Sequence, residues 1–444
     1  KYDFKKDSMN MQVLRLAIPN IITNITVPLL GMVDTAIVGH LQNGDGVDYI
    51  GAIAVGTMIF NIIYWNFGFL RMGTSGFTAQ AYGAKDKEEQ ANILLRACFI
   101  AIVAALLLII FQKPIGLLSM MLIEDKNLVG ALALSYFSIR IWAAPATLSM
   151  YALKGWLIGM QDSKNPMWIS IIINILNIIF SFVLVFYFDM SIKGVALGTV
   201  IAQYGGLITT LLILRKKYKE ISKYFNVKKA LSLEKMKKFF KINSDIFLRT
   251  LCLIIVTSYF TIASTKMPYP TLAMNTLLMQ FFTLFSYFMD GFAYAAESLC
   301  GKAKGENNYP LLQAFVKRFL LWGGVVSIVF IVIYALFGEN ILGIFTDNQD
   351  VISFAKNYLF WILLIPVTGF IAFLYDGILI GLTESVIMRN AIFISTAAFF
   401  LIYFSLTHIM GNNALWLAFL TYLLGRSLLM MIMSKKKIFV KKIK

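Results

Sequence analysis

Charged side chains are scarce in this chain. Asp, Glu, Lys and Arg together make up 14% of its 444 residues, whereas they supply about 25% of a soluble globular domain. Hydrophobic residues make up 59%, and the mean hydropathy is +0.74. A soluble protein of this composition would have to bury nearly every side chain, which the ratio of surface to volume does not permit. The composition therefore indicates an integral membrane protein.

The groups on which enzymes and metal sites depend are also few. The three cysteines, Cys98, Cys252 and Cys300, lie far apart in apolar stretches, and their spacing fits neither a metal site nor a redox pair. The sequence contains no phosphate-binding G-x-x-x-x-G-K-[ST] loop. It also has no H-E-x-x-H motif and no nucleophile elbow. We therefore expect no enzyme activity, no cofactor, no resident metal and no ATP hydrolysis by this chain.

Long apolar stretches fill most of the sequence. A membrane-spanning helix needs roughly 20 mostly apolar residues, and we count twelve such stretches, which predict an all-α membrane protein. The expected spans are residues 14–40, 50–80, 91–112, 128–153, 166–188, 192–214, 242–264, 270–298, 312–337, 351–378, 386–408 and 412–433.

Basic residues account for the formal net charge of +17, and they gather in alternate loops. Lys1, Lys5 and Lys6 precede the first span, and six lysines follow the last one from Lys435 onward. The even-numbered loops carry further lysines, whereas the odd-numbered loops have few basic residues. The positive-inside rule then predicts that both termini are cytoplasmic. Nucleic acid is not needed as a partner to explain the charge.

The chain divides near its middle. Residues 215–241 form its longest polar stretch, which we interpret as a basic cytoplasmic linker between an N-terminal lobe, 1–214, and a C-terminal lobe, 242–444 with its basic tail. The sequence GWLIGMQDS at 155–163 resembles GILIGLTES at 377–385, an offset of 222 residues. Because each half has six spans, we predict two six-helix lobes related by a pseudo-twofold axis along the membrane normal, with substrate between them.

Asp34 lies in the apolar context GMVDTAIVG of the first span. A carboxylate there costs at least about 2.5–3.5 kcal/mol, so such residues usually serve a function. At 1.5 Å per residue, four polar residues of other spans fall in the same outer-half layer: Tyr136, Asn177, Ser181 and Thr199. Together with Asp34 they are our candidate ion and substrate site. The alternative for each amide or hydroxyl is a hydrogen bond between helices.

The second half carries its ionisable residues elsewhere. Arg249, Asp290, Glu297, Asp376 and Arg389 fall toward the cytoplasmic helix ends. Two interpretations stay open for them, namely ion pairs that close an inner gate and interfacial charges that snorkel toward water.

Two prolines, Pro19 and Pro28, lie inside the first span. Each removes a backbone hydrogen bond and favours a bend. A bend at Pro19 that responds to protonation of Asp34 is one interpretation, and a static bend is the other.

Four segments carry a family resemblance. VDTAIVGHL at 33–41, FGFLRMGTSGFTAQAYG at 67–83, SYFMDGFAYAAESLCGKAKG at 286–305 and LYDGILIGLTES at 374–385 resemble the DinF-type branch of the multidrug and toxic compound extrusion (MATE) family. The resemblance implies twelve helices in two lobes in a bacterial inner membrane. It also implies export of varied, often cationic, organic compounds against proton or sodium entry.

The resemblance also assigns site residues. Asp34 corresponds to the family's first-helix aspartate and Pro19 to its first-helix proline, while Tyr136, Asn177 and Thr199 match residues of the fourth, fifth and sixth helices. Ser181 departs from the family pattern, because many relatives have a second aspartate there.

We therefore expect a monomeric secondary antiporter that works by alternating access in the lipid bilayer and exports cationic or neutral amphipathic compounds. A lone carboxylate in an apolar layer favours its protonated form, so we predict proton coupling, with sodium at Asp34 as the alternative. A flippase for lipid-linked precursors would need a cationic cavity, and we expect no Arg or Lys at mid-membrane positions of the first lobe. An organic-anion exporter is not excluded by the basic charge.

Overall fold

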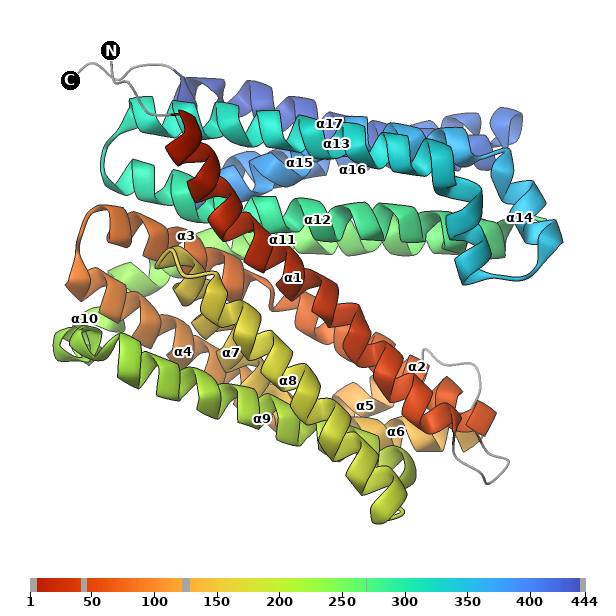
Figure 1. Cartoon of the computed structure of the whole chain (residues 1–444), viewed down its shortest axis with the longest axis horizontal. Helices are drawn as coiled ribbons and strands as arrows, with labels where there is room; N and C mark the ends of the chain where they lie inside the picture. Colours follow the sequence, from red (N-terminus) through yellow and green to blue (C-terminus); the bar gives the residue numbers. More distant parts are fainter. Residues whose placement is uncertain (1–5, 41–45, 122–127, 269, 440–444) are drawn as a thin grey trace. The chain divides into compact units, whose positions relative to one another are not determined.

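The computed structural model describes residues 6–40, 46–121, 128–268 and 270–439. Part of the orientation argument depends on lysines that lie outside these residues, namely Lys1, Lys5, Lys441, Lys442 and Lys444. Within the described part every regular element is helical, and twelve helical segments are long and apolar enough to cross a membrane. The prediction of an all-α chain with twelve spans is confirmed (Figure 1).

Close packing divides the chain into two units. The first unit is Ile22–Phe240, and the second unit is Lys241–Lys444 together with Lys1–Ile21. Helix α1 (Lys6–Gly39) therefore contributes to both. Its first half packs in the second unit because Gly291 has no side chain. A Cβ at Gly291 would lie 2.3 Å from Cγ1 of Ile21.

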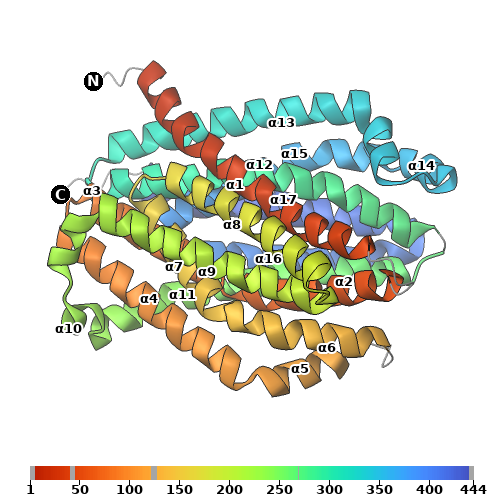
Figure 2. The same cartoon turned by 60° about the horizontal axis from the view of Figure 1, so that its bottom comes forward.

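The first unit contains the later part of α1, nine further α-helices within the described residues and the start of α11. Among its packed pairs are α8 with α9, and α7 with both α3 and α4 (Figure 2). Its elements after α1 are α2 (Gly46–Asn66), α3 (Phe69–Gly83), α4 (Lys87–Ile110), α5 (Gln112–Met121), α6 (Leu128–Arg140), the 3₁₀ turn η1 (Ile141–Ala143), α7 (Ala144–Gly159), α8 (Lys164–Phe182), the π-helical turn η2 (Val183–Tyr187), α9 (Ser191–Lys217), the 3₁₀ turn η3 (Lys219–Tyr224) and α10 (Val227–Ala230).

The second unit packs α12 against α15 and α16 against α17. Its elements after the start of α1 are α11 (Leu233–Thr265), which begins in the first unit, α12 (Thr271–Gly305), α13 (Tyr309–Phe345), α14 (Gln349–Lys356), α15 (Leu359–Gly381), α16 (Ser385–Met410) and α17 (Asn412–Ile438). The expected span at 351–378 began too early. Asn348 caps α14 as a separate short helix, and the chain turns at 357–358 before α15.

The sequence repeat corresponds to repeated geometry inside each unit. A Cβ on Gly155 of α7 would lie 2.3 Å from the carbonyl oxygen of Arg71 on α3. A Cβ on Gly377 of α15 would lie 2.2 Å from the carbonyl oxygen of Ala293 on α12. Both glycines and both carbonyls are related by the offset of 222 residues. The two halves thus share one close helix contact that only glycine permits.

Two turns repeat at the same offset. Lys85 and Asn307 both adopt a left-handed backbone, with φ of 57° and 55°, as do Gln161 and Thr383, with φ of 63° and 54°. Such angles are uncommon for residues other than glycine, so their recurrence supports the predicted internal repeat. The pseudo-twofold axis along the membrane normal stays a prediction.

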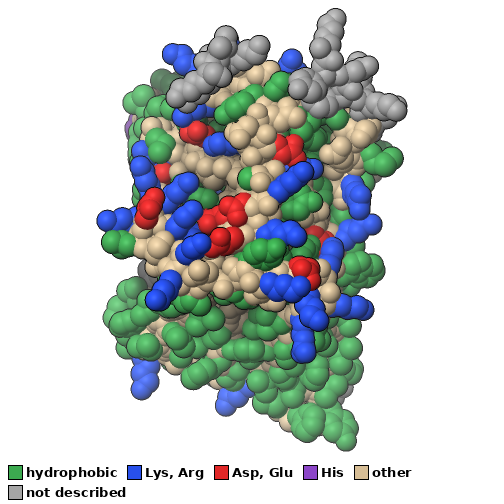
Figure 3. All heavy atoms as spheres, turned by 90° about the vertical axis from the view of Figure 1, so that its left-hand side faces the viewer, with side chains coloured by type: hydrophobic (Ala, Val, Ile, Leu, Met, Phe, Trp, Pro, Cys, Tyr) green, Lys and Arg blue, Asp and Glu red, His purple; other side chains and the backbone are tan. Residues whose placement is uncertain are grey.

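The expected linker, residues 215–241, is helical in large part and packs on the first unit. Arg96 of α4 is buried and donates its Nε to the carbonyl oxygen of Ala230, at 2.8 Å. Lys217 donates to Asp162 Oδ2 at 2.7 Å. Burial acts to raise the pKa of Asp162, but hydrogen bonds from Lys217, Asn165 and Tyr218 outweigh it and hold that pKa below its ordinary value. Figure 3 shows a face on which Lys and Arg outnumber Asp and Glu.

The contact at Gly377 supplies a stability test. Gly377→Val places two methyl groups against the backbone of α12, and overpacking of this kind costs about 1–3 kcal/mol or more. We expect a clearly lower midpoint of thermal unfolding for the purified protein in detergent. Gly324→Val on α13 is the control, because a Cβ there meets nothing within 4 Å. Equal midpoints for the two variants would contradict the packing described.

Candidate functional site

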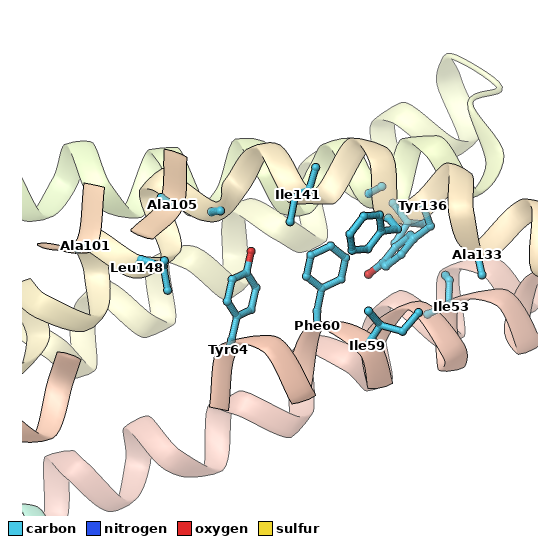
Figure 4. Close-up of a cluster of buried hydrophobic side chains, with 14 of the residues drawn as sticks. Ile53, Ile59, Phe60, Tyr64, Ala101, Ala105, Ala133, Tyr136, Ile141 and Leu148 are labelled. Carbon is cyan, nitrogen blue, oxygen red and sulfur yellow. The ribbon is translucent and has the colours of Figure 1, made fainter. Parts of the chain in front are cut away.

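Aromatic rings line one part of the first unit. Phe60 and Tyr64 of α2 stack at 5.6 Å between ring centroids, and Phe60 lies 6.4 Å from Tyr136 of α6 in an edge arrangement. Figure 4 shows Phe60 and Tyr64 extending from one helix toward the helix that carries Tyr136. Gly56 makes room for this arrangement, because a Cβ there would lie 2.4 Å from Cδ1 of Tyr136.

Asp34 is buried in the later part of α1, with 5% of its surface exposed. Its electrostatic neighbours include Arg140 of α6, Asn177 of α8 and Thr199 of α9. Tyr136 also interacts electrostatically with Asp34. The structure therefore brings residues of three other spans near the carboxylate of Asp34.

Asn177 and Thr199 join the two helices α8 and α9. Asn177 Nδ2 donates to Thr199 Oγ1 at 3.0 Å, and Thr199 Oγ1 lies 3.1 Å from the carbonyl oxygen of Val195. Ser181 follows Asn177 by one turn of α8, where the absence of a side chain at Gly198 allows a close approach. A Cβ at Gly198 would lie 2.4 Å from Ser181 Oγ. All five predicted residues are thus buried in one unit.

Three oxygen atoms of this group have unused hydrogen-bonding capacity. Asp34 Oδ1, Asn177 Oδ1 and Ser181 Oγ are buried and have no hydrogen-bond partner among the described residues. Buried polar atoms are usually paired, and exceptions call for an explanation such as a bound ion or proton. The described residues contain no group of three His, Cys, Asp or Glu that would hold a metal. The oxygens instead suit a proton or a small cation.

Arg140 corrects one expectation from the sequence. It ends α6, and its Nη1 donates to the hydroxyl oxygen of Tyr136 at 2.8 Å. Lys154 of α7 likewise donates to Ser170 Oγ at 2.8 Å. The expectation that mid-membrane positions of the first lobe hold no Arg or Lys was therefore wrong. The sequence already indicated Arg140 as a candidate, because Arg140 falls inside the predicted span 128–153. A charged residue inside a span is by default a candidate functional residue.

The second unit holds a buried cluster of opposite charges. Asp376 of α15 accepts hydrogen bonds from Arg249 of α11 and, at 2.6 Å, from Arg426 of α17. All three residues are buried. Their burial does not fit the interpretation as snorkelling charges. Arg426 was missed by the sequence reasoning although it lies inside the predicted span 412–433. An inner gate formed by Arg249 and Asp376 stays a prediction.

The remaining predicted charges are placed as follows. Glu297 is buried on α12, and Asp290 of the same helix interacts electrostatically with Arg426. Arg389 of α16 donates Nη1 to Asp245 Oδ1 at 2.7 Å. Their roles stay predictions.

Helix α1 is continuous from Lys6 to Gly39, so neither Pro19 nor Pro28 ends it. A response of this helix to protonation stays a prediction.

Comparisons with known proteins agree with the family resemblance. The MatE family profile matches residues 19–183 and 246–409. The chain is 36% identical over 421 residues to DNA damage-inducible protein F of Escherichia coli K12, covering 95% of this chain and 91% of that protein. It is 25% identical over 426 residues to a probable multidrug resistance protein, NorM, of Bacillus anthracis, covering 92% of this chain and 89% of that protein.

Solved structures share the fold. A crystal structure of MATE in the bent conformation has a TM-score of 0.84 at 19% identity, and covers 97% of this chain and 95% of that one. The Vibrio cholerae MATE transporter VcmN in the bent form has a TM-score of 0.85 at 15% identity, and covers 97% of both chains.

The buried charge cluster of the second unit predicts that loss of its carboxylate destabilises the protein more than loss of an exposed carboxylate does. Asp376→Asn removes the carboxylate that both Arg249 and Arg426 bond, and breaking a buried ion pair in this way costs about 3–5 kcal/mol. We expect a large fall in the thermal midpoint in detergent. Glu339→Gln is the control, because Glu339 pairs with Lys356 at 2.9 Å on the exposed surface, where ion pairs contribute about 0–1 kcal/mol. A midpoint for Asp376→Asn as high as that of the control would contradict a buried pair.

Proposed function

Because the chain belongs to the MatE family of multidrug and toxic compound extrusion transporters, we propose that it is a secondary antiporter that exports amphipathic organic compounds in exchange for protons. The proposed substrates are cationic or neutral. The observation that supports this most directly is a group of three buried, unpartnered oxygens, namely Asp34 Oδ1, Asn177 Oδ1 and Ser181 Oγ, of which one belongs to a carboxylate. Substrate export then follows from a change in access that depends on whether Asp34 is protonated.

We propose protons rather than sodium as the coupling ion because the site has one negative charge. A sodium ion in a dry site needs several oxygen ligands and negative charge to offset its dehydration. Asn177, Ser181 and Thr199 add oxygens but no second carboxylate, and Ser181 stands where many relatives have an aspartate. A proton needs one lone pair on Asp34. One proton moving through the membrane potential contributes about 2.3 kcal/mol per 100 mV.

Arginine in both units supports a second candidate, export of organic anions. Arg140 lies beside Tyr136, and Arg249 and Arg426 are buried in the second unit. Arg249 and Arg426 both bond the carboxylate of Asp376, and Arg140 bonds the Tyr136 hydroxyl. Their positive charges are thus already engaged by the chain, whereas the Asp34 carboxylate keeps one oxygen, Oδ1, without a partner among the described residues. This free carboxylate oxygen supports the cationic class. Proteoliposome assays with matched panels of organic cations and anions separate the two candidates.

The location of the chain completes the proposal. We propose a monomer in a bacterial inner membrane, with both termini and residues 215–241 on the cytoplasmic side. The basic residues of the linker support this orientation through the positive-inside rule, and they also suit contact with anionic lipid.

Asp34→Asn tests the coupling mechanism. The variant keeps the shape of the side chain but cannot exchange a proton, so we expect a loss of at least about tenfold in export driven by a pH gradient at zero sodium. The measurement is uptake into proteoliposomes with an imposed gradient, with thermal unfolding as the check on folding. Asp189→Asn, which changes an exposed loop carboxylate of the same unit, should behave as wild type. Full coupled transport by Asp34→Asn would show that Asp34 has only a structural role. Wild-type transport that requires sodium and ignores the pH gradient would overturn proton coupling.

Orientation is tested by cysteine labelling. In a background with Cys98, Cys252 and Cys300 replaced by Ser, we expect Asp189→Cys to react with an impermeant maleimide in intact cells. Lys228→Cys, on exposed α10, should react only after the membrane is opened. The reverse pattern would invert the proposed topology.

A further inference from the structure

Arg140 lies in a pocket of aromatic rings. The carbon Cζ of its guanidinium is 4.7 Å from the ring centre of Phe60 and 5.5 Å from that of Tyr136. Nη1 also donates to the Tyr136 hydroxyl at 2.8 Å. Tyr64 adds a further electrostatic interaction. Aromatic faces and a hydroxyl oxygen are the surroundings in which proteins bind organic cations, and here the chain's own side chain occupies them.

The rings of this pocket are fixed by their own packing. Phe60 stacks on Phe137 at 5.2 Å and on Tyr64 at 5.6 Å between ring centroids. Figure 4 shows Phe60 and Tyr64 on one helix and Tyr136 on a helix that faces it. Gly56 leaves no side chain between α2 and the Tyr136 ring. The guanidinium therefore sits in preformed surroundings.

The positive charge of Arg140 acts on Asp34. Val33 and Ile37, which flank Asp34 on α1, pack in the same apolar cluster as Phe60 and Tyr136. Asp34 and Arg140 interact electrostatically, and Asp34 Oδ1 keeps no hydrogen-bond partner among the described residues. In surroundings of low dielectric constant the guanidinium opposes the binding of any second positive charge at Asp34. A proton overcomes this repulsion through the covalent O–H bond that it forms, whereas a sodium ion has no second carboxylate to offset it.

We propose that Arg140 is the residue that makes this site selective against alkali-metal ions, because its guanidinium is a tethered cation in the aromatic pocket next to Asp34. A proton bound to Asp34 needs neither the coordination space nor the ring of oxygens that sodium needs. The inference rests on the proposed role of Asp34 as the ion-carrying residue and adds the reason why sodium does not take its place.

A purely structural role for Arg140 makes a different prediction. Arg140 and Tyr136 are both on α6, so their hydrogen bond and the ring contacts with Phe60 would then serve only packing. Removal of the guanidinium would lower stability in every salt equally. Selectivity requires instead that its removal creates affinity for sodium, and that this affinity needs Asp34.

The experiment measures sodium binding to the purified full-length protein in detergent, without substrate or gradient. The readout is the rise of the thermal midpoint as sodium replaces N-methylglucamine at constant ionic strength. The variants are Arg140→Gln, Arg140→Met and Arg140→Lys, and the double variant Asp34→Asn with Arg140→Gln. Lys154→Gln is the matched control, because it removes one positive charge from the same unit at a side chain that bonds Ser170.

We expect wild type, Arg140→Lys and Lys154→Gln to be indifferent to sodium. Arg140→Gln and Arg140→Met should bind sodium at least about tenfold more tightly than wild type, and the double variant should lose that gain. Neutral variants that fold but stay indifferent to sodium would overturn the proposal, as would a gain in Lys154→Gln. Should both neutral variants fail to fold, the wild type and a smaller neutral variant, Arg140→Ala, decide. Stabilisation of the wild type by sodium that Asp34→Asn removes contradicts the proposal, as does an Arg140→Ala protein that is indifferent to sodium, and a gain of sodium binding in Arg140→Ala supports it. This experiment measures sodium binding and not transport. If Asp34→Asn failed to abolish export, the proposed function would be wrong, but the sodium-binding result would still test the role of Arg140.

Discussion

The absence of water in the bilayer core governs this molecule, because each buried polar group must find its partner inside the protein. The second unit satisfies this constraint with dense networks. Asn275 exchanges hydrogen bonds with Asn412 and also bonds Ser264 and Trp416. Asp376 is shared by two arginines. Both units keep some buried polar atoms without a hydrogen-bond partner, such as Arg249 Nε in the second unit. Among the described residues, however, the one carboxylate oxygen of this kind is Asp34 Oδ1 of the first unit, and we place the chemistry there.

The internal repeat allows the two units to be compared at matched positions. The offset that relates Gly155 to Gly377 also relates Asp34 to Val256, Asn177 to Phe399 and Ser181 to Tyr403. Val256, Phe399 and Tyr403 are buried and apolar or aromatic. Tyr259 packs edge-on against both Phe399 and Tyr403. Helix contacts and turns are thus retained in both halves. Of the polar group, Tyr136 and Thr199 keep their residue types as Tyr358 and Thr421, whereas the positions of the carboxylate, the amide and Ser181 are apolar or aromatic in the second half.

Hydropathy and the repeat predicted the spans well, because length and apolar composition are local properties. The depth of each polar residue in the membrane also identified residues near Asp34. That depth follows from the constant rise per residue of an α-helix, which fixes the distance of a residue from the helix end. Partners across helices depend on helix rotation, which depth does not supply. For that reason the pairing of Asp376 with Arg426, fifty residues later, was not foreseen. Arg140 was missed for another reason: its span was judged by its apolar majority, and the rule applied to Asp34 was not applied to it.

The split of α1 between the two units has a consequence for biosynthesis. The start of this helix is made first, yet its contacts lie far along the chain: Asn10 accepts a hydrogen bond from Trp322, a separation of 312 residues, and Ile21 packs at Gly291. The rest of the first unit finds its partners before residue 241, including the contact between Arg96 and Ala230. Contacts of such long sequence separation form late. Among the described helices, α1 is therefore made before the others and yet waits for native neighbours far along the chain. The ribosome must have delivered α13 before the start of α1 is held in place.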